Sequence, residues 1–237
     1  MRRRGFTLIE VLIAVTLVSL ISVGMMVAMR VGLSAMQKTN TRLDANRRAA
    51  ATQRIMKQQI EGLIPVTAQC LANGDGARAR ITFFEGQPRS MRFVSTYTLG
   101  DGGRGMPTVL EYQVIPGEGG AGVRLVVNER LYTGALGAGQ FCLGLGPVGP
   151  LFVPIEAGPL SFVLADKLAA CQFQFRDPLG PGEKPAWLDA WVKSTLPDAI
   201  RVNLAPLDPD PGKLPLMTLT VPMHITREPL VLYEDNQ

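Results

Sequence analysis

The chain has 237 residues, of which 46% are hydrophobic, and a formal net charge of +4 at pH 7. A chain of this length can bury one good-sized core with an appended element, whereas two full domains would be cramped. Arg2, Arg3 and Arg4 supply part of the positive charge, and residues 30–62 hold seven basic against two acidic residues. From position 63 onward, fourteen basic face seventeen acidic residues. A nucleic-acid-binding function is therefore disfavoured, because it requires a clustered basic surface.

The first predicted element is an apolar helix that follows the three arginines. Residues 6–29 are mostly apolar. As a helix rising ~1.5 Å per residue they would extend about 36 Å, enough to cross a hydrocarbon core of ~30 Å. The preceding arginines place the N-terminus in the cytoplasm by the positive-inside rule. The sequence therefore predicts a single-pass inner-membrane protein whose residues after Met29 face the periplasm.

A carboxylate interrupts this apolar segment at Glu10. A charge at the centre of a membrane helix costs at least about 2.5–3.5 kcal/mol, which makes an acidic residue there a functional candidate by default. Two simpler interpretations leave Glu10 without a role. One is a secretory signal peptide cleaved near Ser22–Gly24, and the other is a plain signal anchor.

The segment Arg2–Glu10, with the sequence RRRGFTLIE, resembles the leader of the type IV pilin-like superfamily. The resemblance implies that residues 1–5 are a leader peptide, which prepilin peptidase removes by cutting between Gly5 and Phe6 on the cytoplasmic side. It also implies N-methylation of the new N-terminus at Phe6. Residues 6–29 would then be the transmembrane and assembly helix, which stays attached to the protein after cleavage.

The resemblance also suggests a role for Glu10. The amino group of mature Phe6 is a cation that lies one helical turn from Glu10, on the same face. Two buried opposite charges are tolerable only as a hydrogen-bonded pair, because each alone would carry a desolvation cost of several kcal/mol. The resemblance implies that Glu10 of one subunit pairs with the terminal ammonium of a neighbour in a filament and so sets the axial register.

The helical pattern continues beyond the membrane through residues 30–64. This segment lacks proline and carries an apolar stripe, and Gly62 with Pro65 predicts where the helix ends. We expect the stripe to pack the helix against a sheet, and the alternative is a separate coiled-coil partner. Its residues are Ala45, Ala49, Met56, Ile60 and Leu63.

Residues 65–237 predict a β-rich globular periplasmic head. Segments rich in β-branched and aromatic residues alternate with glycine and proline clusters, which is typical of hairpin-built antiparallel sheets. With the N-terminal helix they give an α+β fold, and the resemblance makes it pilin-like. Gly134–Pro150 is expected to be a long irregular loop. The predicted strands are Arg80–Phe84, Met91–Tyr97, Val109–Ile115, Val123–Glu129, Leu160–Leu164, Ala170–Phe175, Ala199–Leu204 and Leu216–Ile225.

No part of the head predicts catalysis, a cofactor or a metal site. Gly117–Gly122 and Gly144–Gly149 match the dinucleotide-binding fingerprint by letter, but neither precedes a predicted helix, so both are expected to be loops. The chain has one histidine, His224, on the polar face of the last strand. Asp208 and Asp210 fall in a proline-rich turn, which explains them more simply than calcium binding.

The three cysteines, Cys70, Cys142 and Cys171, lie too far apart in sequence for the close pairs of a zinc site. In an oxidising periplasm one disulfide plus a free thiol is one interpretation, and buried free thiols are the other. The pair to be tested first is Cys142 with Cys171.

The segments Trp187–Trp191 and Leu196–Leu204 are similar to a tryptophan-then-LPxA[VI]xV pattern of the minor pseudopilin J family of the type II secretion system. Packing alone would explain both segments, since Trp187 and Trp191 could share a helical face, and Ile200, Val202 and Leu204 a strand face. The resemblance implies a tip component of the periplasmic pseudopilus, with other minor pseudopilins and the major pseudopilin as partners. It implies no small-molecule substrate. The alternatives are a minor type IV pilin and an enzyme or binding protein that is merely tethered by its N-terminal helix.

Overall fold

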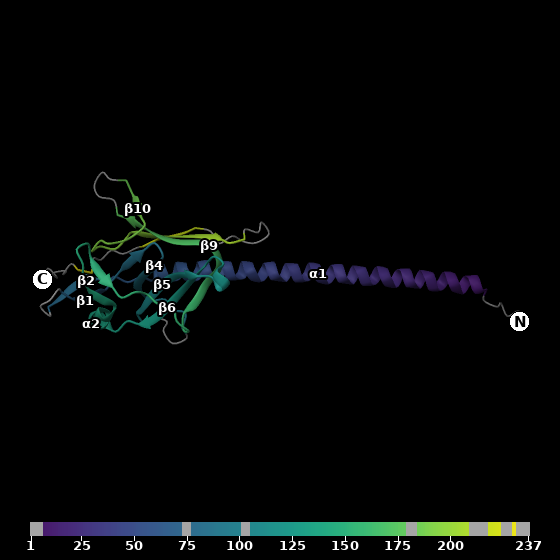
Figure 1. Ribbon diagram of the computed structural model, residues 1–237, viewed down its shortest axis with the longest axis horizontal. Coiled ribbons are helices and arrows are strands. Elements are labelled where there is room, and N and C mark those ends of the chain that lie inside the picture. Colours follow the sequence, from purple (N-terminus) through teal and green to yellow (C-terminus); the bar gives the residue numbers. More distant parts are fainter. Residues whose placement is uncertain are drawn as a thin grey trace, which may run out of the picture. The chain divides into compact units, whose positions relative to one another are not determined.

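The computed structural model describes residues 7–72, 77–100, 105–178, 184–208, 218–223 and 229–230. It begins with a long helix, α1 (Leu8–Glu61), and continues into a mainly antiparallel β head (Figure 1). The predicted α+β architecture is thus confirmed. The chain divides into two compact units between Arg47 and Arg48, so the last turns of α1 belong to the same unit as the head.

The head is built around an eight-stranded sheet in the order β12-β11-β9-β6-β5-β4-β3, with β10 paired to β9. Figure 1 shows β4, β5, β6 and β9 lying side by side. Two small hairpins, β1–β2 and β7–β8, form separate sheets. The strands are β1 (Thr67–Leu71), β2 (Arg78–Thr82), β3 (Glu85–Gln87), β4 (Ser90–Ser95), β5 (Thr108–Pro116), β6 (Val123–Leu131), β7 (Cys142–Leu145), β8 (Pro150–Phe152), β9 (Phe162–Asp177), β10 (Ala186–Leu188), β11 (Ala199–Pro206) and β12 (Leu219–Pro222).

The end of α1 is set by a close approach to strand β4. The Gly62 amide donates to the Gln58 carbonyl at 2.9 Å, and a Cβ at Gly62 would lie only 2.7 Å from Ser95 Oγ. The Ser95 hydroxyl in turn donates to the Gln59 carbonyl at 2.8 Å. These contacts satisfy carbonyls that a helix end would otherwise leave unpaired, and they place the end where Gly62 and Pro65 predict it.

The apolar stripe of α1 packs against the sheet. Met56 and Ile60 are fully buried, and Ala49 and Leu63 are each 7% exposed. Met56, Ile60 and Leu63 join a core cluster with side chains from one face of the sheet, including Phe93 of β4. These side chains therefore pack the helix onto the head, as expected. Because they are buried there, they are not available to a coiled-coil partner.

A polar lock fixes the rotation of α1 on the sheet. Gln59 is fully buried. Its side-chain amide donates to Glu129 Oε1 at 3.0 Å and accepts a hydrogen bond from the Tyr112 hydroxyl. Glu129 also accepts the backbone amides of Leu99 and Gly100 at 2.7 and 3.0 Å. Burial raises the pKa of Tyr112, with a smaller contribution from the charge of Glu129, so this hydroxyl stays a donor.

The opposite face of β4 and β5 carries a second, smaller core. Because side chains alternate along a strand, Val94 and Val109 point away from the helix-facing Phe93 and Leu110. They pack with Phe83, Ala68, Ala138 and Phe141. Helix α2 (Gly134–Ala138) and the short 3₁₀ turn η2 (Gly139–Phe141) supply two of these residues. Gly134–Pro150 is therefore not the irregular loop that its glycine content predicted.

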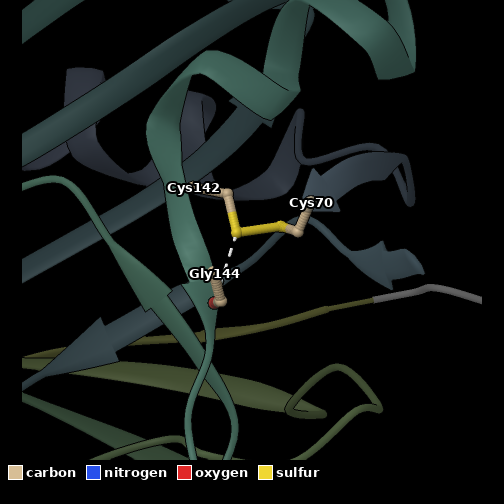
Figure 2. The surroundings of a disulfide bond; sticks show 3 residues. All are labelled: Cys70, Cys142 and Gly144. Carbon is tan, nitrogen blue, oxygen red and sulfur yellow. Dashed lines mark hydrogen bonds between the residues drawn. A yellow bond between two sulfur atoms is a disulfide. The ribbon is translucent and has the colours of Figure 1, made fainter. Parts of the chain in front are cut away.

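The disulfide joins Cys70 of β1 to Cys142 of β7, with a Cα–Cα distance of 5.5 Å (Figure 2). The predicted pairing of Cys142 with Cys171 was wrong. Cys171 lies in the helix-facing core, whereas Cys142 follows Phe141 of the smaller core on the other side of the sheet. Cys171 is a buried free thiol whose pKa burial raises to about 12.

Strand positions were predicted better than strand limits. The segments predicted near Leu160–Leu164 and Ala170–Phe175 are one continuous strand, β9. Trp187 lies in β10, so it does not share a helical face with Trp191. The expected strand face of β11 is confirmed, since Ile200, Val202 and Leu204 are buried. The prediction missed five short strands: β1, β3, β7, β8 and β10.

Peptide mapping without reduction should recover Cys70 linked to Cys142 and Cys171 as a free thiol. Reduction should lower the free energy of unfolding by about 2–4 kcal/mol, because it releases a constraint on the unfolded chain. A Cys171→Ala variant should keep the same linked peptide. A linked peptide containing Cys171 would contradict the assignment.

Candidate functional site

The N-terminal part of α1 presents apolar side chains on all sides. Leu8, Leu20 and Met26 are 84%, 70% and 71% exposed. No charged residue occurs between Glu10 and Arg30, and the most apolar 18-residue window has a mean hydropathy of 2.6. A helix that is apolar all round requires an apolar environment. Among the described residues, α1 is thus one helix that is long and apolar enough to cross a membrane.

The hydroxyl groups in this segment are satisfied by the helix itself. Thr16, Ser19 and Ser22 donate to carbonyls three or four residues earlier, at 2.8–2.9 Å. In hydrocarbon an unsatisfied polar group costs several kcal/mol, and these internal hydrogen bonds avoid that cost. These hydroxyls therefore need no hydrogen-bond partner from outside the helix.

Glu10 differs from these residues, because its carboxylate has no such partner among the residues that the structure describes. It lies in the first turn of α1 and is exposed. Its backbone amide donates to the Thr7 carbonyl at 3.0 Å. Within the part of the chain that the structure describes, its side chain makes neither a hydrogen bond nor an ion pair. Gly5 and Phe6, the predicted cleavage and methylation residues, lie outside the described residues.

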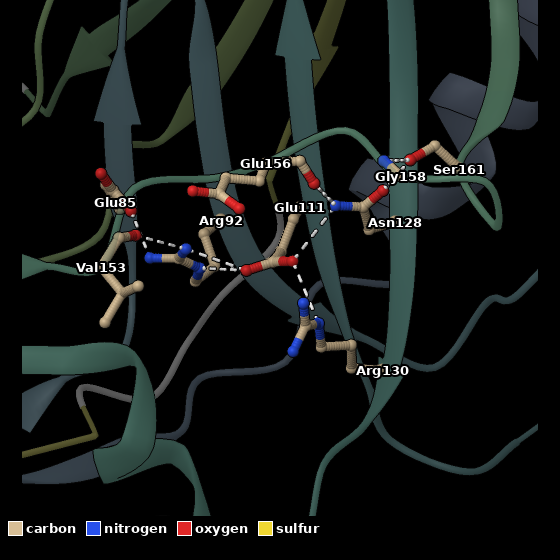
Figure 3. Close-up of polar contacts among 9 residues, drawn as sticks. All are labelled: Glu85, Arg92, Glu111, Asn128, Arg130, Val153, Glu156, Gly158 and Ser161. Carbon is tan, nitrogen blue, oxygen red and sulfur yellow. Dashed lines mark hydrogen bonds and ion pairs between the residues drawn. The ribbon is translucent and has the colours of Figure 1, made fainter.

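The head contains a second group of charged residues, which the sequence did not single out. Glu85, Arg92, Glu111 and Asn128 are directly opposite one another on β3, β4, β5 and β6. They form a row across four strands, which we call the polar row (Figure 3). Arg92 is 1% exposed and Glu111 is 3% exposed. Single-sequence reasoning can place each residue on a strand, but the row appears only once the register is known.

Arg92 is fully satisfied in this row. Its guanidinium donates to Glu111 Oε1 at 2.9 Å, to Glu85 Oε2 at 2.6 Å and to the Val153 carbonyl at 2.8 Å. The rings of Phe141 and Phe152 lie 5.3 and 5.7 Å from its Cζ. A buried charge is tolerated when it is both paired and hydrogen-bonded, and Arg92 meets both conditions.

The polar row holds the chain segment 153–161 onto the sheet. Arg92 binds the carbonyl of Val153, and the Asn128 amide donates to the carbonyl of Glu156 at 2.9 Å. The Ser161 hydroxyl donates to Asn128 Oδ1 at 2.5 Å. Arg130 pairs with the second oxygen of Glu111 at 3.3 Å. These contacts use the donors and acceptors within the head, so the row is a structural element rather than a ligand site.

The remaining candidates have structural explanations. Gly117–Gly122 is the turn between β5 and β6, where Gly119, Gly120 and Gly122 have positive φ and the Gly117 amide donates to the Gly122 carbonyl. Gly144–Gly149 lies in the β7–β8 hairpin. Both were correctly predicted not to open a helix. The described residues contain no group of three metal-ligating side chains. Asp208 is described and exposed, whereas Asp210 and His224 lie outside the described residues.

The tryptophan and LPxA[VI]xV segments are also held by packing. Trp191 forms a bridge to Gly86, and its indole donates to the Thr195 carbonyl at 2.7 Å. Arg201 lies 3.7 Å above the ring of Trp187. Asp198 pairs with Arg176 at 2.7 Å. Contacts within the head therefore account for both segments.

Comparison with known proteins identifies the N-terminal segment. Residues 1–29 match the family described as the prokaryotic N-terminal methylation motif. No curated protein matches the chain. The motif covers Gly5, Phe6 and Glu10, and it supports a type IV pilin-like protein that is processed by prepilin peptidase. The long apolar helix is consistent with a single-pass membrane anchor.

Glu85 makes the stability of the head dependent on pH. Burial raises the pKa of this carboxyl, Glu111 adds to the rise, and Arg92 opposes it. The folded state therefore binds the proton more tightly than the unfolded state. The stability that Glu85 contributes should fall as the pH rises from about 4.5 through the folded pKa. The measurement is urea-induced unfolding in detergent. The free energy of unfolding of the unsubstituted protein minus that of Glu85→Gln should decline over this pH range.

An exposed carboxylate provides the comparison for this titration. Glu118 is paired with Arg124 at the surface, where its side chain is 87% exposed, so Glu118→Gln reports the effect of losing a surface charge. If the difference in the free energy of unfolding between the unsubstituted protein and Glu85→Gln stays constant across the same pH range, the raised pKa of Glu85 is refuted.

Proposed function

We propose that the protein is a minor pseudopilin of the type II secretion system. It would be a tip component of the periplasmic pseudopilus, which is needed for the export of folded proteins across the outer membrane. The assignment as a pilin-like protein rests on one observation, the exposed apolar helix with Glu10 in its first turn, within a methylation motif. The J-type subtype rests on the resemblance of Trp187–Trp191 and Leu196–Leu204.

The proposed processing converts a precursor into an assembly subunit. Cleavage between Gly5 and Phe6 removes the three arginines and leaves the apolar helix in the membrane. Methylation then modifies the amino group of Phe6. Because that amino group is a cation one turn from Glu10, neighbouring subunits could neutralise each carboxylate with a terminal ammonium. The subunit would position its partners rather than catalyse, and a separate cytoplasmic motor would consume ATP.

Two features of the chain support a periplasmic location of the head. The disulfide between Cys70 and Cys142 is of the kind that persists in oxidising compartments. In the precursor, Arg2–Arg4 would hold the N-terminus on the cytoplasmic side of the inner membrane. The expected partners are other minor pseudopilins, the major pseudopilin and prepilin peptidase.

A minor type IV pilin is the second candidate, because the methylation motif and the helix are common to both systems. It would act in pilus assembly, adhesion or DNA uptake. The subunits that contact this protein discriminate the two candidates. Secretion components would support the pseudopilin, and pilus subunits would support the pilin.

The proposal predicts that Glu10→Ala is cleaved normally but fails to assemble. The variant leaves a neighbour's ammonium without its partner, and an unpaired buried charge costs about 3–5 kcal/mol. Crosslinking to partner subunits in native membranes should therefore fall by at least about tenfold. The partners that are crosslinked to the unsubstituted protein are identified by mass spectrometry.

Ser19→Ala is the matched control, because the Ser19 hydroxyl is satisfied by the Val15 carbonyl within the helix. It should be cleaved and crosslinked like the unsubstituted protein. Undiminished crosslinking of Glu10→Ala would remove the assembly role of the carboxylate.

A further inference from the structure

We propose that α1 carries a cationic collar, formed by Arg30, Lys38 and Arg42, which binds the headgroups of anionic phospholipids where the helix leaves the membrane. The collar rests on α1 being a membrane anchor. It does not depend on whether the protein serves secretion or a pilus.

The collar lies where the apolar surface of the helix ends. Arg30 is the first charged residue after Glu10. Large apolar side chains continue past it, with Val31, Leu33 and Met36 at 61%, 54% and 62% exposed. Mixed apolar and cationic side chains are typical of a segment at the membrane interface, since lipid can cover the apolar groups while the cations reach the headgroups.

The charges of this segment have one sign and no ion-pair partner among the described residues. Arg30, Lys38 and Arg42 are exposed, and none of them forms an ion pair within the described part of the chain. Asp44 is the first acidic residue after Glu10, and it lies 3.9 Å from Arg47. That pair is largely exposed and therefore weak, but it accounts for Arg47, which we leave out of the collar.

The geometry of a helix brings Lys38 and Arg42 within reach of the headgroups, whereas Arg30, about 9 Å before Met36, reaches them by extending its long side chain toward the head side. The headgroup layer is about 5–7 Å thick. At ~1.5 Å per residue, Lys38 and Arg42 lie about 3 and 9 Å beyond Met36. Helical side chains lean toward the N-terminus, which here is the direction of the membrane. Lys38 and Arg42 are four residues apart and therefore share a face of the helix.

Processing at Gly5 would make the collar the dominant basic flank of the membrane segment. The precursor carries Arg2, Arg3 and Arg4 on one side of the apolar segment, and cleavage removes them. The mature helix then has its side-chain cations on the head side. Anionic headgroups there attract each cation with about 1 kcal/mol, an attraction that falls off within a Debye length of ~8 Å at physiological ionic strength.

The chemistry favours lipid over an acidic protein as the occupant. The cations are interleaved with exposed apolar side chains that continue directly from the apolar segment, so one lipid layer can satisfy both. An acidic protein surface would satisfy the cations but would leave Val31, Leu33 and Met36 in water.

The test uses the full chain in bilayers of phosphatidylcholine containing a spin-labelled lipid. The fraction of immobilised label gives the association constant of phosphatidylglycerol relative to phosphatidylcholine. We expect the anionic lipid to be preferred several-fold at low salt, and the preference to shrink at high salt. The variant Arg30→Gln/Lys38→Gln/Arg42→Gln should lower it by up to about fivefold per cation, the equivalent of ~1 kcal/mol, and should retain only the share that Arg2–Arg4 contribute.

The control variant Arg47→Gln/Arg54→Gln/Lys57→Gln removes the same number of charges further along the same helix and should retain the preference. Unchanged binding of phosphatidylcholine by all three proteins shows that the anchor is intact, so a failure of the collar is distinguishable from a failure of the anchor. Equal loss in both variants, or no preference in the unsubstituted protein, would overturn the proposal. So would crosslinking of the collar to an acidic protein with no effect of anionic lipid.

Discussion

A carboxylate carried into hydrocarbon has to be neutralised, and this constraint governs how the N-terminal helix can be used. The hydroxyls of Thr16, Ser19 and Ser22 are satisfied by carbonyls of the same helix. Glu10 has no comparable partner among the described residues. A helix with this surface is stabilised in a membrane or a bundle when a cation pairs with Glu10, and the proposed cleavage before Phe6, within the methylation motif, would create such a cation.

In the head, by contrast, the buried charges are neutralised by other residues of the head. Arg92 is satisfied by Glu85, Glu111 and the Val153 carbonyl, and Gln59 is satisfied by Glu129 and Tyr112. These networks fix the sheet, the segment 153–161 and the last turns of α1 to one another. The disulfide adds a covalent link between β1 and β7.

Periodicity predicted the elements that depend on local patterns. The apolar run and the stripe from Ala45 to Leu63 predicted the helix, and Gly62 with Pro65 predicted where it ends. Features that depend on register could not be predicted. Cys171 and Cys142 lie on opposite sides of the sheet, so the pairing assumed from sequence was wrong. Likewise Arg92 and Glu111 are 19 residues apart, and only the pairing of β4 with β5 brings them together.

The most direct test of the account is whether Glu10 touches the terminal amine of another subunit. A membrane-permeant carbodiimide activates a carboxylate, and an amine in contact with it then forms an amide bond. In native membranes with assembled filaments, the account predicts a peptide in which the Glu10 side chain is joined to the methylated N-terminus of a neighbouring mature subunit. Recovery of Glu10 without any linked N-terminus, or of a mature chain that begins elsewhere than Phe6, would contradict it.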